Sequence, residues 1–413
     1  MNHNNVIELE KPETLASDLL TEILRKGSQK LLAAAVEAEI EAHLDEYKHL
    51  KDDHGGQRII RNGYNPEREV QTGIGQIKVK VPRGRDKQQD GEPIHFRSSI
   101  LPPYLRRTRS IEELLPWLYL KGVSTGDFSD ALEALLGKDA PGLSPATIGR
   151  LKTKWGDEMD QWNKRSLAGK HYVYFWADGL YSNVRMAERQ CLLVIIGVTE
   201  SGKKELVAIE DGFRESELSW MTVLRDLTER GLTAGPKLAI GDGSLGFWKA
   251  LGQVYPNTQC QRCWVHKTAN VLNKLPKSLQ SKAKEKLQDI WMAPGIVEAK
   301  KNFGIFIELY GAKYPKAAKC LEKDRAVLLS FYSYPADHWK HIRTTNPIES
   351  TFATVRLRTA KVRNCFSAQT VVTMAFQLCR CAEKRWQKIN GLKKLAKIIE
   401  GIEFVDGVER IAA

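Results

Sequence analysis

The sequence lacks both a long apolar run and an export signal. Its longest apolar stretch, Cys191 to Val198, is far shorter than the ~20 residues that a membrane-spanning helix needs. Met1 to Asn5 do not form a basic segment followed by an apolar one, which is the pattern of a secretory signal. Cysteine is scarce, and its odd number, 7, indicates free thiols in a reducing compartment. We therefore expect a cytoplasmic protein without a membrane partner.

Acidic residues are fewer than basic residues in this sequence. The chain has 63 Lys and Arg residues against 50 Asp and Glu, a formal net charge of +13. This excess predicts attraction to polyanions, although charge alone is equally compatible with a soluble basic protein. The hydrophobic content of 42% is ordinary for a protein with a packed core. At roughly 150 residues per domain, the length indicates two to four domains.

Residues 1–100 combine a helical pattern with a β pattern. Apolar residues recur at three- and four-residue steps from Glu13 to Leu50, which predicts a helix. This helix could dimerise, dock another segment or pack in a core, and the sequence leaves these alternatives open. From Ile77 to Val81 apolar and basic residues alternate, which predicts a strand. We expect an N-terminal helix followed by a small β region.

Residues 101–168 contain three predicted helices. The first two cover 110–121 and 124–136, and Ser144 followed by Pro145 is a strong start signal for the third. The basic side chains of this third helix are Arg150, Lys152 and Lys154. Two short helices and a basic third are typical of a helix-turn-helix, whose last helix enters the major groove of DNA. The alternative is a plain helical bundle with a solvated basic face.

Residues 169–266 change to a pattern of strands and helices. Strands are predicted over 172–177, 191–198, 205–209 and 237–241, with a hairpin through Ser201-Gly202 between the second and third. Helices are predicted over 215–230 and 244–251. Mixed strands with helices between them favour an α/β layered domain.

The α/β pattern is interrupted and then resumes. From 267 to 338 strand signals vanish and Lys-rich helical patterns replace them, which indicates a helical insertion. The second part of the α/β core is expected over 339–390, followed by a C-terminal tail over 391–413. The expected fold class is therefore multidomain α+β.

Three acidic residues stand where predicted elements begin or end. Asp178 and Asp242 each follow an apolar run, and Glu349 lies in the first turn of a predicted helix that has Asn346 as its N-cap and Pro347 as its first residue. Each acid has an ordinary explanation, because Asp-Gly pairs are common in turns and a Glu in this position completes a capping box. Carboxylates at strand ends, joined by a third from a helix, can also converge on divalent metal. We expect the three acids to form a metal-binding catalytic site.

Arginines accompany Glu349. Arg356 and Arg363 fall almost in line with it at about 100° per residue, and Arg343 precedes it. This arrangement suits a helix face that meets a phosphate backbone. In a two-metal site, Mg²⁺ ions roughly 4 Å apart activate the attacking oxygen and stabilise the leaving oxygen. Mg²⁺ prefers carboxylate ligands, so two Mg²⁺ ions are expected, with Mn²⁺ as a substitute.

A cysteine–histidine cluster follows Asp242. It contains Cys260, Cys263 and His266. Such spacing can indicate zinc, but no clear fourth ligand lies nearby and Cys260 fits a core position on a strand. We therefore do not expect zinc. Cys263 and His266 are expected to support the active site, with His266 close to a scissile phosphate.

These motifs together resemble a known family. They are Ala177-Asp178-Gly179-Leu180, Gly241-Asp242-Gly243 with Gly246-Phe247, Gln261-Arg262-Cys263-Trp264-Val265-His266-Lys267 followed by Asn270-Val271-Leu272, and Thr345-Asn346-Pro347-Ile348-Glu349-Ser350. The combination resembles the Mutator-type bacterial insertion-sequence transposases, from the N-terminal helix to about Trp386. All three acidic positions match.

The resemblance implies a ribonuclease H-like catalytic core interrupted by a helical insertion. It implies that Asp178, Asp242 and Glu349 are metal-binding catalytic acids, and it matches Cys263 and His266 to a motif that follows the second Asp. It further implies recognition of terminal inverted repeats by the N-terminal region, double-stranded DNA as partner, and a homodimer or larger homo-oligomer on that DNA. A circular DNA intermediate is a general expectation for the family.

We therefore expect a DNA transposase that binds terminal inverted repeats and catalyses metal-dependent strand cleavage and strand transfer. Its expected location is the bacterial cytoplasm, at the nucleoid when bound to DNA. One alternative is a two-metal nuclease or junction resolvase, which would hydrolyse DNA without strand transfer. The other is a non-catalytic DNA-binding regulator, which would bind the DNA ends whether or not metal is present.

Overall fold

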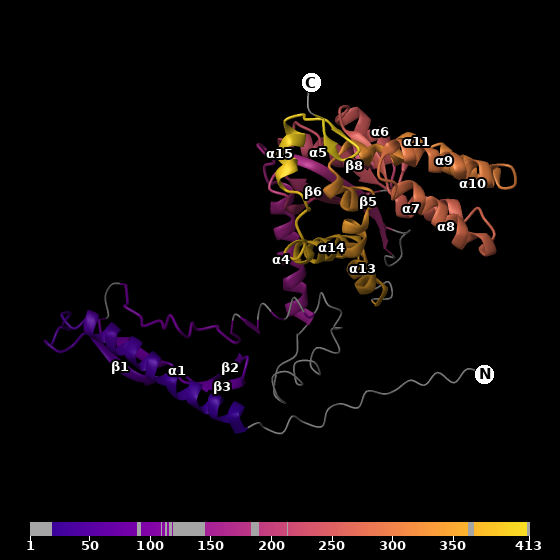
Figure 1. The fold of residues 1–413 in the computed structure, drawn as a ribbon. Helices are drawn as coiled ribbons and strands as arrows, with labels where there is room; N and C mark the ends of the chain where they lie inside the picture. Colours follow the sequence, from indigo (N-terminus) through magenta and orange to yellow (C-terminus); the bar gives the residue numbers. More distant parts are fainter. Residues whose placement is uncertain are drawn as a thin grey trace, which may run out of the picture. The chain divides into compact units, whose positions relative to one another are not determined.

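The computed structural model describes residues 19–88, 92–108, 145–182, 190–212, 214–361 and 367–410, with isolated positions at 110, 111, 114 and 118. The chain divides into two compact units, Met1–Leu151 and Lys152–Ala413 (Figure 1). Apart from those isolated positions, the helices predicted over 110–121 and 124–136 lie outside the described residues. The helix-turn-helix therefore stays a prediction.

The first unit is built on one long helix, α1 (Leu19–Glu46), which buries Val36 and Ile40. Its β region has two antiparallel pairs, β1 (Ile59–Tyr64) with β4 (Pro82–Asp86) and β2 (Arg68–Thr72) with β3 (Gly75–Val79). The small core gathers Val36, Val70, Ile77, Val79 and Leu101.

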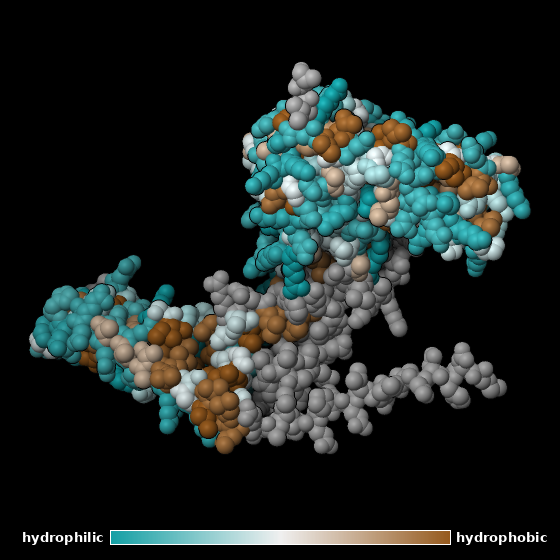
Figure 2. Space-filling model, viewed as in Figure 1, coloured by the Kyte–Doolittle hydropathy of each residue, from teal (hydrophilic) through white to brown (hydrophobic). Residues whose placement is uncertain are grey.

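A second set of apolar residues on α1 faces away from this core. Leu20, Leu24 and Leu31 are exposed, and Figure 2 shows apolar residues gathered on this unit. Both faces of α1 are thus apolar, which is why its sequence leaves more than one packing role open.

The second unit contains a five-stranded mixed sheet in the order β7-β6-β5-β8-β9. The strands are β5 (Tyr172–Ser182), β6 (Gln190–Thr199), β7 (Lys204–Gly212), β8 (Leu238–Gly241) and β9 (Gln259–Arg262). Strand β6 pairs antiparallel with both β5 and β7. Strand β8 runs parallel to β5, and β9 runs parallel to β8. Parallel partners bring their carboxyl ends to the same edge of the sheet.

The hairpin between β6 and β7 turns at Gly202, as the Ser201-Gly202 pair predicts. Gly202 has φ +74°, which glycine adopts without the steric cost that a Cβ would add. The apolar run in β6 is buried along its length from Cys191 to Val198. A continuous apolar strand is typical of a sheet covered on both faces.

Helices α5 (Glu217–Glu229) and α6 (Leu245–Val254) cover one face of the sheet. Their apolar side chains join a core with the odd-numbered residues Phe175 and Ala177 of β5. The even-numbered residues of β5 point to the other face because side chains alternate along a strand.

On that other face, Tyr174 bonds to the His338 ring and Trp176 donates to the His341 carbonyl. Helix α13 (Asn346–Lys361) contacts β5, and α14 (Ala368–Glu383) contacts β7. Asp178 has the same parity as Tyr174 and Trp176, so the strand directs its carboxyl group to this face.

A helical segment, residues 264–342, lies between β9 and α13. Its helices are α7 (Trp264–Leu272), α8 (Lys277–Trp291), α9 (Ile296–Gly311), α10 (Pro315–Glu322), α11 (Arg325–Leu328), the 3-10 turns η1 (Ser330–Ser333) and η2 (Ala336–His338), and α12 (Trp339–Ile342). The segment contains no strand, as the loss of β patterns after residue 266 predicts.

The remaining elements flank the sheet. Helix α4 (Pro145–Asn163) begins at the predicted Pro145, and its Trp162 ring packs on Phe376 of α14. After α14 come α15 (Lys393–Ile399) and a short hairpin of β10 (Phe404–Val405) and β11 (Val408–Glu409). Among the described residues no helix has the length and apolarity to cross a membrane.

The sheet core should dominate the stability of the second unit. Leu224 on α5 is fully buried, so Leu224→Ala should lower the free energy of unfolding by about 2–5 kcal/mol. Leu218 on the same helix is 76% exposed, and Leu218→Ala should change stability by less than about 0.5 kcal/mol. Urea unfolding of both variants, followed by circular dichroism, measures the difference. Equal losses in the two variants would contradict the packing described.

Candidate active site

Asp178 lies within β5 and not at its end. The strand continues to Ser182, with Asp178 opposite Val194 of β6. The turn that the Asp178-Gly179 pair could have formed is therefore absent, because β6 pairs with β5 through both residues. The Asp178 side chain is buried, and its Oδ1 accepts a hydrogen bond from the Gly179 N–H at 2.9 Å.

Asp242 stands beside Asp178. Trp176 of β5 pairs with Ile240 of β8 in parallel register, and each Asp follows two residues after its paired residue. Asp242 lies in a turn, as predicted, and its Oδ1 accepts from the Ser244 N–H at 2.8 Å. The two carboxyl groups thus meet at one edge of the sheet because their strands run parallel.

Glu215 is a further carboxylate at this edge, and sequence reasoning missed it. One ligand oxygen from each of Asp178, Asp242 and Glu215 lies within 4.8 Å of the other two. Glu215 precedes α5, after Arg214, whose φ of +61° is unusual for a residue with a side chain. A Cβ at Gly179 would overlap the Glu215 carboxylate, so the glycine leaves room for it. No motif in the sequence pointed to Glu215.

The crowding of these acids alters their titration. Burial raises the pKa of Asp178 to about 7, and the Asp242 carboxylate contributes to the rise, whereas His266 opposes it. Burial also raises the pKa of Glu215, again with Asp242 contributing. Like charges brought together in a partly dry site favour the protonated form unless a cation balances them.

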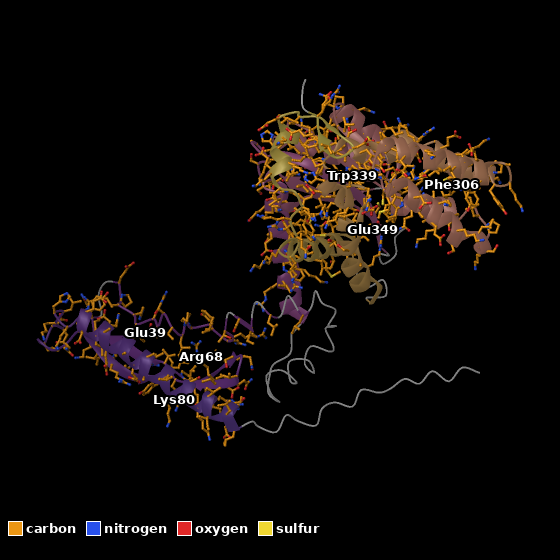
Figure 3. The ribbon with its side chains drawn as sticks, in the orientation of Figure 1. Glu39, Arg68, Lys80, Phe306, Trp339 and Glu349 are labelled. Carbon is orange, nitrogen blue, oxygen red and sulfur yellow. The ribbon has the colours of Figure 1, made fainter. Side chains whose placement is uncertain are left out.

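Glu349 comes from α13 (Figure 3) and belongs to a second group. Ligand atoms of Cys263, His266 and Glu349 lie within 4.8 Å of one another. Glu349 Oε1 accepts from the Thr345 hydroxyl at 2.7 Å and lies 3.7 Å from His266 Nδ1. Helix α13 begins at Asn346, so the residue before it is Thr345 and not the predicted cap Asn346.

Cys263 and His266 are hydrogen-bonded to each other beside Glu349. A hydrogen bond with Cys263 raises the pKa of His266 to about 9, and the charges of Cys263, Asp178 and Glu349 contribute to the rise, against desolvation. Burial alone would raise the pKa of the Cys263 thiol, but hydrogen bonds from His266 and Thr345 lower it. The charges of both Asp178 and Glu349 thus favour the protonated form of His266.

The other cysteine of the cluster, Cys260, lies on β9, in line with the predicted strand position. It is not in the group with Cys263 and His266. Burial raises the pKa of its thiol to about 11, which favours the neutral form.

The predicted DNA-contacting residues have diverse surroundings. Arg150 and Lys154 of α4 are exposed and Lys152 is partly buried. Arg343 is engaged within the protein, since it donates to the Trp291 carbonyl at 2.8 Å and lies over the Trp291 ring. Arg356 is exposed on α13, and Arg363 lies outside the described residues.

The comparisons with known proteins agree with one another. The family model for transposases of the Mutator family matches residues 2–388. The transposase for insertion sequence element IST2 of Acidithiobacillus ferrooxidans is 53% identical over 286 residues, which cover 68% of this chain and 95% of the relative. The transposase for insertion sequence element IS6120 of Mycolicibacterium smegmatis is 50% identical over 298 residues, 72% of this chain and 92% of the relative.

A solved structure, the Drosophila P element transposase strand transfer complex, matches 72% of this chain and 89% of its own at 9% identity. Its TM-score of 0.24 is too low to support any statement about this fold. The two sequence matches cover 68% and 72% of this chain and 95% and 92% of the relatives. The chain belongs to the Mutator family of transposases and is an enzyme that cleaves and transfers DNA strands.

Proposed function

We propose that this transposase cleaves and joins DNA at the site formed by Asp178, Asp242 and Glu349, acting on the terminal inverted repeats of an insertion sequence. One observation carries the proposal. Asp178 and Asp242 each extend two residues beyond the parallel pair of Trp176 and Ile240, so their carboxylates lie side by side at one sheet edge. Helix α13 contacts β5 and bears the third acid.

We propose that the second unit is a ribonuclease H-like core, over 169–266 and 339–390, with the helical insertion at 267–338. The support is the mixed sheet, with three antiparallel strands followed by two parallel ones in the order β7-β6-β5-β8-β9. The described helical segment, 264–342, begins directly after β9. In this scheme 1–100, 101–168 and 391–413 lie outside the core.

The chemistry of the donor set fits a divalent cation of the hard type. Asp178, Asp242 and Glu215 offer only carboxylate oxygens, which Mg²⁺ and Mn²⁺ prefer. Their mutual repulsion, which contributes to the raised pKa of Asp178 and Glu215, is what a bound cation would relieve. We propose two Mg²⁺ ions, replaceable by Mn²⁺. We do not propose zinc, because Cys260 lies outside the group of Cys263, His266 and Glu349, which therefore lacks, among the described residues, the fourth protein ligand of a structural zinc site.

The reaction has two displacements at phosphorus. Water attacks the phosphodiester at the element end, the P–O3′ bond breaks, and a 3′-hydroxyl is freed. That hydroxyl then attacks a second phosphodiester, and the 3′-oxygen of the attacked strand leaves. The chemistry supplied by bound divalent cations is activation of the attacking oxygen and stabilisation of the leaving one.

Protein groups hold and orient the reactants. In the proposed roles, Asp178 and Asp242 are held by the sheet edge, and Glu349 is oriented by the Thr345 hydroxyl. His266, with a pKa of about 9, is mainly protonated at neutral pH and can donate a hydrogen bond to a phosphate oxygen. Cys263 stabilises that protonated form by its hydrogen bond, which gives this pair a supporting role.

The three acids should be individually essential. Asp178→Asn, Asp242→Asn and Glu349→Gln should each lower cleavage and strand transfer at least about 10³-fold, because each loss removes several kcal/mol of transition-state stabilisation. The assay is cleavage and joining of a duplex that carries the element's own ends, with Mg²⁺. DNA binding, measured in parallel, should be unchanged. Retained cleavage in all three variants would refute the site.

Glu215 belongs in the same experiment. Its position beside both aspartates predicts that Glu215→Gln lowers cleavage by about 10- to 100-fold, as loss of a supporting carboxylate does at metal sites. Glu217→Gln is the matched control, because Glu217 is on the same loop-to-helix junction but pairs with Lys249 and Gln253. Equal activity of the two variants would exclude Glu215 from the site.

We propose that residues 101–168 form the helix-turn-helix that reads double-stranded terminal-repeat DNA, with Arg150, Lys152 and Lys154 on its last helix. The exposed positions of Arg150 and Lys154 on α4 support contact with phosphates. Arg356 on α13 is proposed to contact DNA near the active site, together with Arg363. Arg343 is a weaker candidate, since its guanidinium is held at Trp291.

Salt dependence tests the role of α4. The logarithm of the DNA association constant falls linearly with the logarithm of the salt concentration. Changing Arg150, Lys152 and Lys154 together to Ala should make this fall less steep, by about 0.9 for each phosphate that the protein no longer neutralises. It should also reduce the preference for terminal repeats over random DNA. A control triple on α8, with Lys282, Lys284 and Lys286 changed to Ala, removes the same charge. If both variants lose affinity equally and keep the preference, α4 is not the reading helix.

We also propose that the transposase acts on its DNA as a homodimer or larger homo-oligomer. Transposition joins two element ends, and one active site on each of two subunits would serve both. Light scattering of the complex with a pair of terminal-repeat duplexes should give the mass of at least two chains. A complex of one chain with each duplex that still completes strand transfer would contradict this proposal.

A further inference from the structure

The side chains of the segment from Gln261 to Lys267 extend in two directions. Cys263 and His266 reach Thr345 and Glu349, as described above. The other polar side chains reach the helical segment instead. Gln261 is fully buried, donates to the Leu328 carbonyl and accepts from the Phe331 N–H.

Arg262 and Lys267 meet at one carboxylate of the helical segment, that of Asp324. Arg262 Nη1 donates to Asp324 Oδ2 at 2.6 Å, and the fully buried Lys267 ammonium donates to the same oxygen. Lys267 also donates to the Cys320 carbonyl at 2.6 Å. Because two buried cations share one carboxylate, the position of Asp324 determines where both side chains lie.

Arg262 also touches the turn that carries Asp242. It lies beside Gly241 across the β8–β9 pair, and a Cβ added at Gly243 would overlap its guanidinium. Gly243 has φ +92°, a conformation that residues with a Cβ rarely adopt. The guanidinium therefore packs directly on the backbone of the Asp242–Gly243 turn. The N–H of Ser244, the residue after this turn, orients the Asp242 carboxylate.

Asp324 holds one side of the Arg262 guanidinium through its hydrogen bond with Nη1. The Arg262 Nε is buried and has no hydrogen-bond partner among the described residues. A planar guanidinium can fill a flat space between a carboxylate and a backbone turn, whereas a lysine ammonium is a point charge on a flexible stem. Loss of Asp324, or of the planar group, would leave the turn without this support.

We propose that Arg262 is a positioning residue that links the helical segment to Asp242. Asp324 of the segment holds the guanidinium, and the guanidinium holds the Asp242–Gly243 turn in the geometry that binds metal. This role of Arg262 depends on the proposed function only in that Asp242 holds a divalent cation. The helical segment is then a structural part of the active site and sets the metal affinity of the sheet edge.

Arg262→Lys is the main test, because Lys keeps the positive charge opposite Asp324 but loses the planar group against Gly243. The full-length variant should need about 10- to 100-fold more Mn²⁺ for half-saturation than the parent protein, the usual effect of changing a group that orients a metal ligand. Binding of Mn²⁺ to the DNA-free protein is measured by electron paramagnetic resonance. The Mn²⁺ concentration for half-maximal cleavage should rise in parallel, with DNA affinity unchanged.

A second variant serves if Arg262→Lys does not fold. Asp324→Glu keeps the charge but moves the carboxylate by one methylene, so it should raise the half-saturating Mn²⁺ concentration in the same direction. Lys267→Met leaves Arg262 paired with Asp324 and should keep the parent affinity. Asp289→Asn changes an exposed acid of the same helical segment and should also have no effect.

Leu224→Ala separates positioning from general stability, since it destabilises the sheet core away from Arg262. The proposal predicts that it lowers the melting temperature without changing Mn²⁺ affinity. Unchanged Mn²⁺ affinity in folded Arg262→Lys and Asp324→Glu would overturn the proposal, as would an equal loss of affinity in Leu224→Ala. Asp178→Asn tests the metal site itself, because retained Mn²⁺ binding and cleavage there would refute the proposed function independently of Arg262.

Discussion

The parallel pairing of β5 with β8 is the constraint on which the site depends. It places Trp176 opposite Ile240, so Asp178 and Asp242, each two residues further along its strand, lie close to each other. The repulsion that results is tolerated because β5 and β8 are buried and hydrogen-bonded on both sides, by β6 and β9. The sheet thus holds two like charges at its edge, and a balancing positive group, His266, comes from the helix that follows β9.

The sequence predicted this framework well where one strong local pattern decided the outcome. The strands around Asp178 and Asp242, the hairpin at Gly202 and the absence of strands between residue 266 and α13 all follow from apolar periodicity and turn residues. The continuation of β5 past Asp178 was missed because an Asp-Gly pair resembles a turn, and only pairing with β6 makes it a strand. The start of α13 was misjudged by one residue for a similar reason, since Thr345 and Asn346 are both good caps.

The site was only partly predictable. Asp178, Asp242 and Glu349 stand in motifs, but Glu215 precedes an ordinary helix, and its role depends on a glycine that is far from it in sequence. The association of Glu349 with Cys263 and His266 also depends on how α13 packs near α7, which no local pattern encodes. The same is true of Asp324, whose two cationic partners lie 62 and 57 residues before it in the chain.

The order of elements along the chain has a consequence for synthesis of the enzyme. The sheet, both aspartates and Glu215 are translated before the helical segment, and Glu349 and Thr345 follow it. A chain released from the ribosome between β9 and α13 would therefore contain all five strands of the sheet but not the third acid. If Glu349 is as essential as proposed, every such fragment would be unable to cut the chromosome. Nuclease activity would then emerge only in chains whose translation had passed α13.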